Sequence, residues 1–206
     1  MIFATDAKPK ISLATRLETE RLVLRPVQPP DIPLLYRALR HNADYLRPFS
    51  PAAPPTDRRP TLALATREME RWRALWKSGE SYALFCFMRG QEKGESARII
   101  GRVTLGRVTR GAFLNSYLGY FVDRDEQGKG ITSEAVRGAL DFAFGPLGLH
   151  RVQAAIMPRN LPSLRVAEKC GFRREGYAPR YLQIAGVWED HDIFAMTAEE
   201  WPKNSA

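Results

Sequence analysis

Two glycines separated by one lysine lie in the segment QGKGIT, residues 127–132. Glycine adopts left-handed backbone conformations easily, so Gly128 and Gly130 let the chain curl until several N–H groups point into one concavity. If a helix begins directly after this loop, its unpaired amides and positive dipole end add to that concavity, and a diphosphate fits there. The same residues are equally typical of a turn followed by a helix cap, because the segment matches neither the three-glycine dinucleotide fingerprint nor a P-loop.

Other side chains that could do chemistry gather near the C-terminus. His150 begins a predicted strand, where a structural hydrogen bond is the commoner use of a histidine. Asp190 and His191 lie in a predicted turn, WEDH, which is either close to a substrate or simply solvated. Tyr181 and Trp188 could line a substrate groove, although aromatic residues at strand spacing are more often part of the core.

The pattern of apolar residues, prolines and glycines predicts the elements that position these residues. In the first half we expect a strand within 16–28, a helix capped by Asp31, an irregular proline-rich loop over 48–60, a helix over 61–77 ended by Gly79, and a hairpin of strands 82–88 and 98–108. In the second half we expect a strand over 117–123, a helix that Thr132 or Ser133 caps and Gly145 ends, a strand over 150–157, a helix from Pro162 to Cys170, and one or two closing strands.

Composition sets limits on the class of protein. A chain of 206 residues with 44% hydrophobic residues fits one globular domain. The net charge of +8 favours an anionic ligand or a nucleic-acid-associated partner, but basic and acidic residues are interspersed, as on a solvated surface. The sequence shows neither an apolar run of about 20 residues nor a signal peptide, so we expect a soluble cytoplasmic protein without a membrane partner. Cys86 and Cys170 lie in apolar surroundings and are predicted to be buried thiols.

A second motif, NLPS at residues 160–163, is followed by RVAEKCGF. With the preceding strand and glycine loop, it resembles the GNAT family of acyl-CoA-dependent acetyltransferases. That family has a strand, a Gln/Arg-x-x-Gly-x-Gly/Ala loop, a helix, another strand, and an Asn-x-x-Ser helix start closed by Gly-Phe. The loop matches at Gln127 and Gly130 and departs at Thr132. Because a larger residue still donates its backbone amide, we expect cofactor binding to be retained.

A narrower resemblance covers nearly the whole chain. The blocks TERLVLRP, RGAFLNSYLGY, QGKG, HRV, MPRN, GFRREGYAPRYLQIAGVWEDH and AMTAEEW look like the RimJ branch of ribosomal-protein-alanine N-acetyltransferases. The resemblance implies a mixed α/β (α+β) GNAT fold, in which helices flank a central, twisted, mostly antiparallel sheet whose strands splay at the cofactor site. It implies a single domain over 1–206, with residues 1–15 as a flexible or peripheral N-terminal segment. Dimerisation occurs among relatives, so a homodimer is possible.

The resemblance also implies where acetyl-CoA binds and that no metal is needed. The pantetheine arm is expected along the backbone of Tyr120, Phe121 and Val122, and the pyrophosphate at Gln127, Gly128, Lys129, Gly130, Ile131, Thr132 and Ser133. Asn160 and Ser163 are expected to reach the pantetheine and the thiol, and Arg165 or Lys169 the nucleotide phosphates. From the residues alone, Asn160 and Ser163 are equally consistent with a plain helix N-cap.

Direct acetyl transfer requires a neutral amine, a polarised thioester carbonyl and a proton for the leaving thiolate. The N–H of Phe121 or Val122 is the candidate for polarising the carbonyl, and Ser163 the candidate proton donor. Many relatives have a glutamate base where this chain has Tyr117, which could instead shape the acceptor tunnel or relay protons through water. An α-amine has a pKa near ~8 and is partly neutral already, whereas a lysine amine near ~10.4 needs a strong base. Tyr117 therefore favours an α-amine acceptor.

Three functions remain open at this stage. The first is acetylation of the N-terminal amine of a protein, with a ribosomal protein as the leading candidate, so that any contact with nucleic acid is indirect. The second is acetylation of a small amine such as an antibiotic or a polyamine. The third is a non-catalytic RNA- or ribosome-associated module, against which the strand YALFCFM counts because no basic residues alternate with its aromatic ones.

Overall fold

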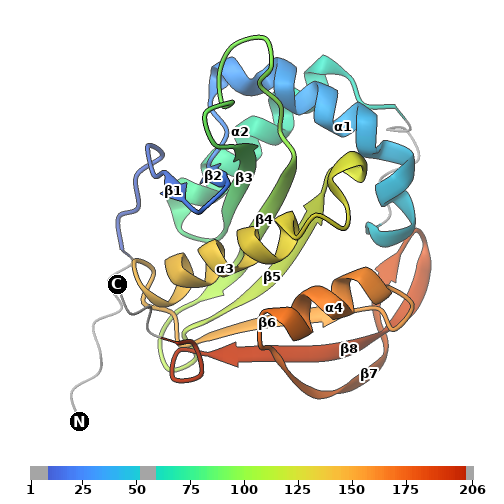
Figure 1. Cartoon of the computed structure of the whole chain (residues 1–206). Helices are drawn as coiled ribbons and strands as arrows, with labels where there is room; N and C mark the ends of the chain where they lie inside the picture. Colours follow the sequence, from blue (N-terminus) through green and yellow to red (C-terminus); the bar gives the residue numbers. More distant parts are fainter. Residues whose placement is uncertain (1–8, 52–58, 203–206) are drawn as a thin grey trace.

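The computed structural model describes residues 9–51 and 59–202. Its strands form a single eight-stranded mixed sheet in the order β1-β2-β3-β4-β5-β6-β8-β7 (Figure 1). The strands are β1 (Leu17–Glu18), β2 (Leu22–Arg25), β3 (Tyr82–Met88), β4 (Gly101–Thr109), β5 (Asn115–Val122), β6 (Arg151–Ile156), β7 (Arg173–Ile184) and β8 (Val187–Thr197). Neighbouring strands are antiparallel except β5 and β6, which are parallel. The predicted fold class, a mixed and mostly antiparallel sheet flanked by helices, is confirmed.

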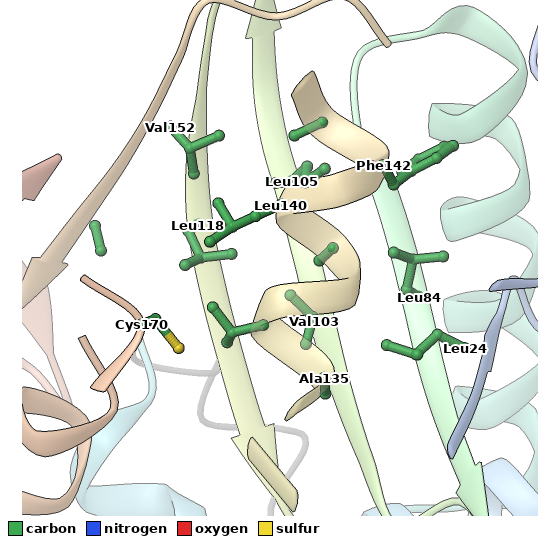
Figure 2. Packing of buried hydrophobic residues seen from close by; sticks show 14 of the residues in the cluster. Leu24, Leu84, Val103, Leu105, Leu118, Ala135, Leu140, Phe142, Val152 and Cys170 are labelled. Carbon is green, nitrogen blue, oxygen red and sulfur yellow. The ribbon is translucent and has the colours of Figure 1, made fainter. Parts of the chain in front are cut away.

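The helices cover both faces of the sheet. They are α1 (Ile32–Leu46), α2 (Leu62–Ser78), α3 (Ile131–Phe144) and α4 (Leu161–Lys169), with short 3-10 helices η1 (Pro29–Asp31), η2 (Arg47–Phe49) and η3 (Arg124–Glu126). Alternate residues of a strand point to opposite faces of the sheet. On one face Val103, Leu105 and Leu118 pack in an apolar cluster with α3 and α4, as Figure 2 shows around Leu140. Phe85 and its neighbours on the opposite face form a second cluster with α1 and α2.

Both predicted buried thiols are confirmed. Cys86 lies in β3 and Cys170 follows α4, where its side chain points toward the first cluster in Figure 2. Burial raises the pKa of the Cys86 thiol to about 12 and that of Cys170 to about 11. Neither thiol is therefore a thiolate at neutral pH, which fits a packing role.

Asp31 is the N-cap residue of α1 as predicted, but neither of the two predicted side-chain caps forms. The Asp31 carboxylate does not cap α1; it accepts hydrogen bonds from the Arg25 guanidinium at 2.6 and 2.9 Å and from the Gln28 amide at 2.7 Å. Neither Thr132 nor Ser133 caps α3, since the helix begins at Ile131 directly after Gly130. In the first case Arg25 occupies the carboxylate, and in the second the two residues lie inside the helix.

The proline-rich loop and the WEDH turn also differ from expectation. Arg47–Phe49 form a 3-10 turn, and Pro51 makes an isolated bridge to Ile184, so part of the predicted irregular loop is ordered against β7. Its residues 52–58, with Pro54 and Pro55, lie outside the described residues. WEDH lies within β8, and the turn comes just before it at Gly186.

The described part of the N-terminal segment contacts the body of the protein. The Ile11 carbonyl accepts a hydrogen bond from the Trp76 indole at 3.1 Å, and the Leu13 carbonyl accepts one from the Gln28 side chain at 2.6 Å. Residues 1–8 lie outside the described residues. Across residues 9–51 and 59–202, none of the helices combines the length and apolar composition that crossing a bilayer requires.

Candidate active site

The parallel pair β5–β6 separates after three residue pairs. Asn115, Ser116 and Tyr117 pair with β6, and Tyr117 opposite Gln153 is the last pair. Beyond it β5 continues along β4 as far as Val122, while β6 continues along β8, and the two strands run apart in Figure 1. Within the described part of the chain, the outer edge of residues 118–122 therefore has no strand partner. An amide-containing chain such as pantetheine can bind to this edge as a strand would.

Tyr120 and α4 close one face of the separated strand. The Tyr120 hydroxyl donates a hydrogen bond to the Ser163 carbonyl at 3.0 Å. Burial raises the pKa of Tyr120, so the hydroxyl stays protonated and remains a donor. Leu118, on the same face, is buried in the α3 cluster. The contact brings two predicted cofactor-binding segments together, the strand 120–122 and the helix start 160–163.

The glycine loop follows β5 and η3 and leads directly into α3. Gly128 and Gly130 have φ of +75° and +78°, the left-handed conformation that the sequence predicts for them. The first amides of a helix have no intrahelical acceptor, and no side chain caps α3 in the described structure, so these amides are free. A Cβ on Gly128 would meet nothing within 4 Å, so the loop is open to solvent there. These free amides at a helix N-terminus suit a diphosphate.

A brace from the N-terminal strands holds the loop, and sequence reasoning did not single it out. The Arg21 guanidinium donates to Glu134 at 2.7 Å and to the Lys129 carbonyl at 3.0 Å, and the Thr19 hydroxyl also donates to Glu134. Burial alone would raise the pKa of Glu134, but the bonds from Thr19 and Arg21 outweigh it and hold that pKa below its ordinary value. The only signal in the sequence was a charged residue, Arg21, directly before the buried strand β2.

The predicted residues of α4 extend from its N-cap to its last residue. The Asn160 side chain accepts a hydrogen bond from the Ser163 amide at 3.3 Å, so Asn160 is an N-cap. The exposed Arg165 and Lys169 lie farther along the helix. The Lys169 carbonyl accepts a bond from Arg137 of α3 at 2.7 Å, and the neighbouring Cys170 thiol lies 3.6 Å from the Ser133 carbonyl. The C-terminal end of α4 thus packs against the first turns of α3, beside the glycine loop.

Charged side chains before the loop fix η3 to α1. One ligand atom from each of His41, Asp123 and Asp125 lies within 4.8 Å of the other two. Asn42 donates to Asp123 at 3.1 Å, and the His41 ring lies 2.8 Å from Asp125 and 3.2 Å from the Arg124 guanidinium. With these polar partners already in place, the cluster acts as a clamp upstream of the loop.

Tyr117 lies where the strands separate and contacts residues from the C-terminal hairpin. Its hydroxyl is a hydrogen-bond neighbour of the Tyr181 hydroxyl, and the Tyr181 ring centroid lies 5.4 Å from that of His191. His191 is only 3% exposed, so the interpretation of a solvated turn is wrong. Its Nδ1 lies 3.0 Å from the Glu189 carbonyl and must donate to it, which leaves the Nε2 lone pair available. Burial is the main cause that raises the pKa of Tyr181, and the neighbouring Tyr117 raises it further.

A bulge in β7 orients Tyr181. The register with β8 shifts between Ala178 and Leu182, and Arg180 in that interval has a φ of +49°. Asp190 accepts bonds from the Arg180 amide at 2.7 Å and from the Tyr177 hydroxyl, so its role is to hold the bulge.

Two aromatic candidates and one histidine differ in their surroundings. Trp188 is 59% exposed and Tyr181 38% exposed, so neither is a core residue. His150 is exposed and its Nε2 lies 3.1 Å from Glu199, which matches the structural role predicted for it.

Comparison with known proteins gives one consistent family. An Acetyltransferase (GNAT) domain matches residues 21–173. The probable N-acetyltransferase YjcK of Bacillus subtilis is 36% identical, with 87% of this chain and 96% of that protein aligned. The ribosomal protein uS5-alanine N-acetyltransferase of Escherichia coli is 33% identical, with 90% and 92% aligned. The structure of Mycobacterium smegmatis RimJ in complex with CoA-disulfide superposes with a TM-score of 0.80 at 32% identity, covering 88% of this chain and 84% of that one.

The free edge of β5, the open glycine loop and the uncapped start of α3 fit acetyl-CoA, which confirms the predicted cofactor. The protein is an acetyl-CoA-dependent N-acetyltransferase. Since the matched domain spans well over half of the 206 residues, and relatives above 30% identity align along nearly the whole chain, the chain belongs to the GNAT family of acetyltransferases.

Proposed function

We propose that this enzyme acetylates the α-amine at the N-terminus of a protein, and that the protein is a ribosomal one. The observation that carries the proposal is Tyr117, which stands where the strands separate and has Tyr181 rather than a carboxylate as its neighbour. A site without a strong base suits an α-amine, whose pKa near ~8 leaves a sizeable neutral fraction at neutral pH. The names of the uS5-alanine N-acetyltransferase and of RimJ support the same acceptor class.

Acetyl-CoA supplies an activated acetyl thioester, and the chain binds and orients it. The backbone edge of Tyr120, Phe121 and Val122 binds the pantetheine arm, and residues 127–133 bind the pyrophosphate through their amides. Asn160 orients the start of α4, and Arg165 and Lys169 offer positive charge to the nucleotide phosphates from its exposed surface.

Two groups act near the reacting atoms. The N–H of Phe121 or Val122 on the free edge donates to the carbonyl oxygen as negative charge develops there. The Ser163 hydroxyl, next to a backbone that Asn160 and Tyr120 fix, donates a proton to the leaving sulfur and takes one back from solvent. The reaction is a direct attack within a ternary complex, without a covalent enzyme intermediate.

The proton released by the amine passes through Tyr117 toward the C-terminal hairpin. A tyrosine with a pKa near ~10 is a poor base by itself, so Tyr117 acts as a relay. Tyr181 is its hydrogen-bond neighbour, and the Nε2 lone pair of His191 beside Tyr181 is the final acceptor. A ribosomal acceptor also places the enzyme in the cytoplasm.

A substrate screen tests the acceptor. Acetyl-CoA turnover is measured with peptides that carry a free N-terminus, with the same peptides N-blocked but containing lysine, and with a polyamine and an aminoglycoside. We expect kcat/KM for free N-termini to exceed that of every other class at least about tenfold, since the site has no strong base. Preference for lysine, a polyamine or an aminoglycoside would refute the proposal.

A further inference from the structure

Three cross-strand pairs of β4 and β5 form a small panel on the sheet face that α2 covers. The panel pairs are Arg102–Phe121, Thr104–Gly119 and Gly106–Tyr117. Alternate residues of both strands, such as Val103 and Leu118, point to the opposite face and pack with α3. At the centre of the panel Gly119 is exposed, and a Cβ built on it would meet nothing within 4 Å. The centre of the panel is therefore open between Tyr117 at one end and Arg102 with Phe121 at the other.

Arg102 is held among aromatic rings without full hydrogen bonding. Its guanidinium carbon lies 4.8 Å from the ring centroid of Trp72, 5.2 Å from that of Phe121 and 5.9 Å from that of Phe85. The Arg102 Nε and the Thr104 hydroxyl on the same panel are buried and have no hydrogen-bond partner within the described chain. Buried polar atoms normally find partners, so these two atoms leave hydrogen-bonding capacity for a ligand or an ordered water beside Gly119.

Arg102 stays cationic in this position. Burial lowers its pKa to about 10, with Glu68 opposing and Arg71 reinforcing that change, and this value is still well above neutrality. The charged or titratable groups that act on it are Glu68 and Arg71 from α2 and the neutral thiol of Cys86 from β3; across the panel stands Tyr117. Glu68 also pairs with Arg71 at 3.4 Å, so the local charge is net positive.

The acceptor amine reaches the cofactor edge over this panel. An attacking amine must approach the thioester to about 3–3.5 Å, and in the proposed function the thioester lies along the free edge of β5. Leu118, Tyr120 and α4 close the other face of that edge. Gly119 is the point of β5 where the remaining face is open, so the amine arrives beside Gly119.

We propose that Arg102 activates the acceptor electrostatically: the cation disfavours the ammonium form of the amine bound over Gly119 and so favours the neutral amine that attacks. This inference rests on the proposed direct attack along β5. Arg102 is a diagonal neighbour of Gly119 across the strand pair, a separation of about 7–8 Å between their Cα atoms. If the guanidinium and the amine lie about as far apart, at an effective dielectric constant near ~20, Coulomb's law gives a shift in the amine pKa of about one unit or more. A neighbouring cation is an established way to obtain a neutral amine without a strong base.

The same charge selects the acceptor. A polyamine or a multiply charged antibiotic brings a second ammonium toward Arg102, whereas a peptide brings a carbonyl oxygen that can accept from the orphan Nε and from the Thr104 hydroxyl. Arg102 therefore favours peptides by repelling the alternative amines as well as by binding the preferred one.

The pH dependence of Arg102→Met and Arg102→Lys tests this role. In Arg102→Met we expect the acidic limb of kcat at saturating peptide to move up by about one pH unit, with the rate recovering at high pH, because only the charge effect on the bound amine is lost. Arg102→Lys keeps the charge, so the acidic limb of its pH–rate profile should lie within a few tenths of a pH unit of the native one. An equal loss for Arg102→Met at every pH would show a structural role and overturn the proposal.

A direct readout needs neither turnover nor a variant. The protonation midpoint of an acceptor peptide labelled with ¹⁵N at its α-amine is measured free and in the dead-end complex of the native enzyme with CoA. We expect the bound midpoint to be lower by about one pH unit or more. An unshifted midpoint refutes the role of Arg102 and leaves the proposed acceptor intact. A peptide set that is not acetylated at any pH refutes the proposed acceptor instead.

Discussion

The two ends of the active site are built in different ways. Most of the cofactor end is continuous in sequence, from Leu118 through the glycine loop to Ser133, with α4 beside it, and consists largely of backbone amides and an unpaired strand edge. The acceptor end is assembled from single side chains of α2, β4, β5, β7 and β8, among them Trp72, Arg102 and His191. Binding of the donor thus depends on backbone geometry, and activation of the acceptor on side-chain placement.

Because the two ends are built differently, we expect them to respond differently to substitution. A side chain added to the loop disturbs several amides at once, because they belong to one turn. A side chain removed from the acceptor end takes away one interaction and leaves the cofactor edge intact. We therefore expect substitutions at the cofactor end to change affinity for CoA, and those at the acceptor end to change turnover and its pH dependence.

Gly130→Asp should have the largest effect. The substitution forces a non-glycine residue into a φ of +78° and places a negative charge beside the pyrophosphate, so we expect CoA affinity to fall about 100-fold or more. Calorimetry measures this directly. Gly94→Asp is the matched control, since Gly94 has a φ of +83° and open space around it in the loop between β3 and β4. Unchanged affinity in Gly130→Asp would mean that the loop is only a helix cap.

Ser163→Ala should reduce turnover by about tenfold to a hundredfold while CoA affinity changes much less, because the hydroxyl serves the leaving sulfur and the backbone contacts of Ser163 remain. Steady-state kinetics and calorimetry on the same preparation separate the two quantities. Full activity in this variant would assign the proton donation to another group.

His191→Asn tests the far end of the proposed proton path. Asparagine can still donate to the Glu189 carbonyl, but it lacks the Nε2 lone pair, so we expect kcat to fall about tenfold near neutral pH and less at high pH. His150→Asn, at an exposed histidine that pairs with Glu199, is the control and should match the native rate. A native pH profile in His191→Asn would remove this residue from the path.

The smallest effect is expected at the brace of the loop. The pKa of Glu134 is lowered in the folded protein, so its bonds contribute stability above the unfolded value near 4.5, and that stability is lost as the pH falls through the lower folded value. Glu134→Gln should therefore be less stable than the native protein at neutral pH by about 1 kcal/mol, and the difference should shrink below pH ~4.5. Chemical denaturation at several pH values measures it, and a difference that does not change with pH would contradict this account.

Much of the cofactor end could be predicted from the sequence, because its signals are local. Alternation identified the strands, and the spacing of Gly128 and Gly130 predicted the left-handed turn that the structure contains. The predicted caps of α1 and α3 failed because Asp31 pairs with Arg25 and because Gly130 starts α3 by itself. Those outcomes depend on partners that local patterns do not show.

Less of the acceptor end could be predicted, because register and bulges determine it. The bulge between Ala178 and Leu182 orients Tyr181, and burial of His191 follows from the way β8 continues through WEDH. Arg102 becomes notable only when the pairing of β4 with β5 places it beside Gly119. Arg21 was likewise visible as a residue but not as the partner of Glu134, 113 positions later.

The central claim is that the separated β5 edge and the glycine loop form one site for the donor. Calorimetric titration of the purified protein with CoA tests it most directly. We predict one binding site per chain, with an affinity that Gly130→Asp weakens and His191→Asn leaves unchanged. No detectable binding at millimolar CoA, or an affinity that Gly130→Asp does not alter, would contradict the account.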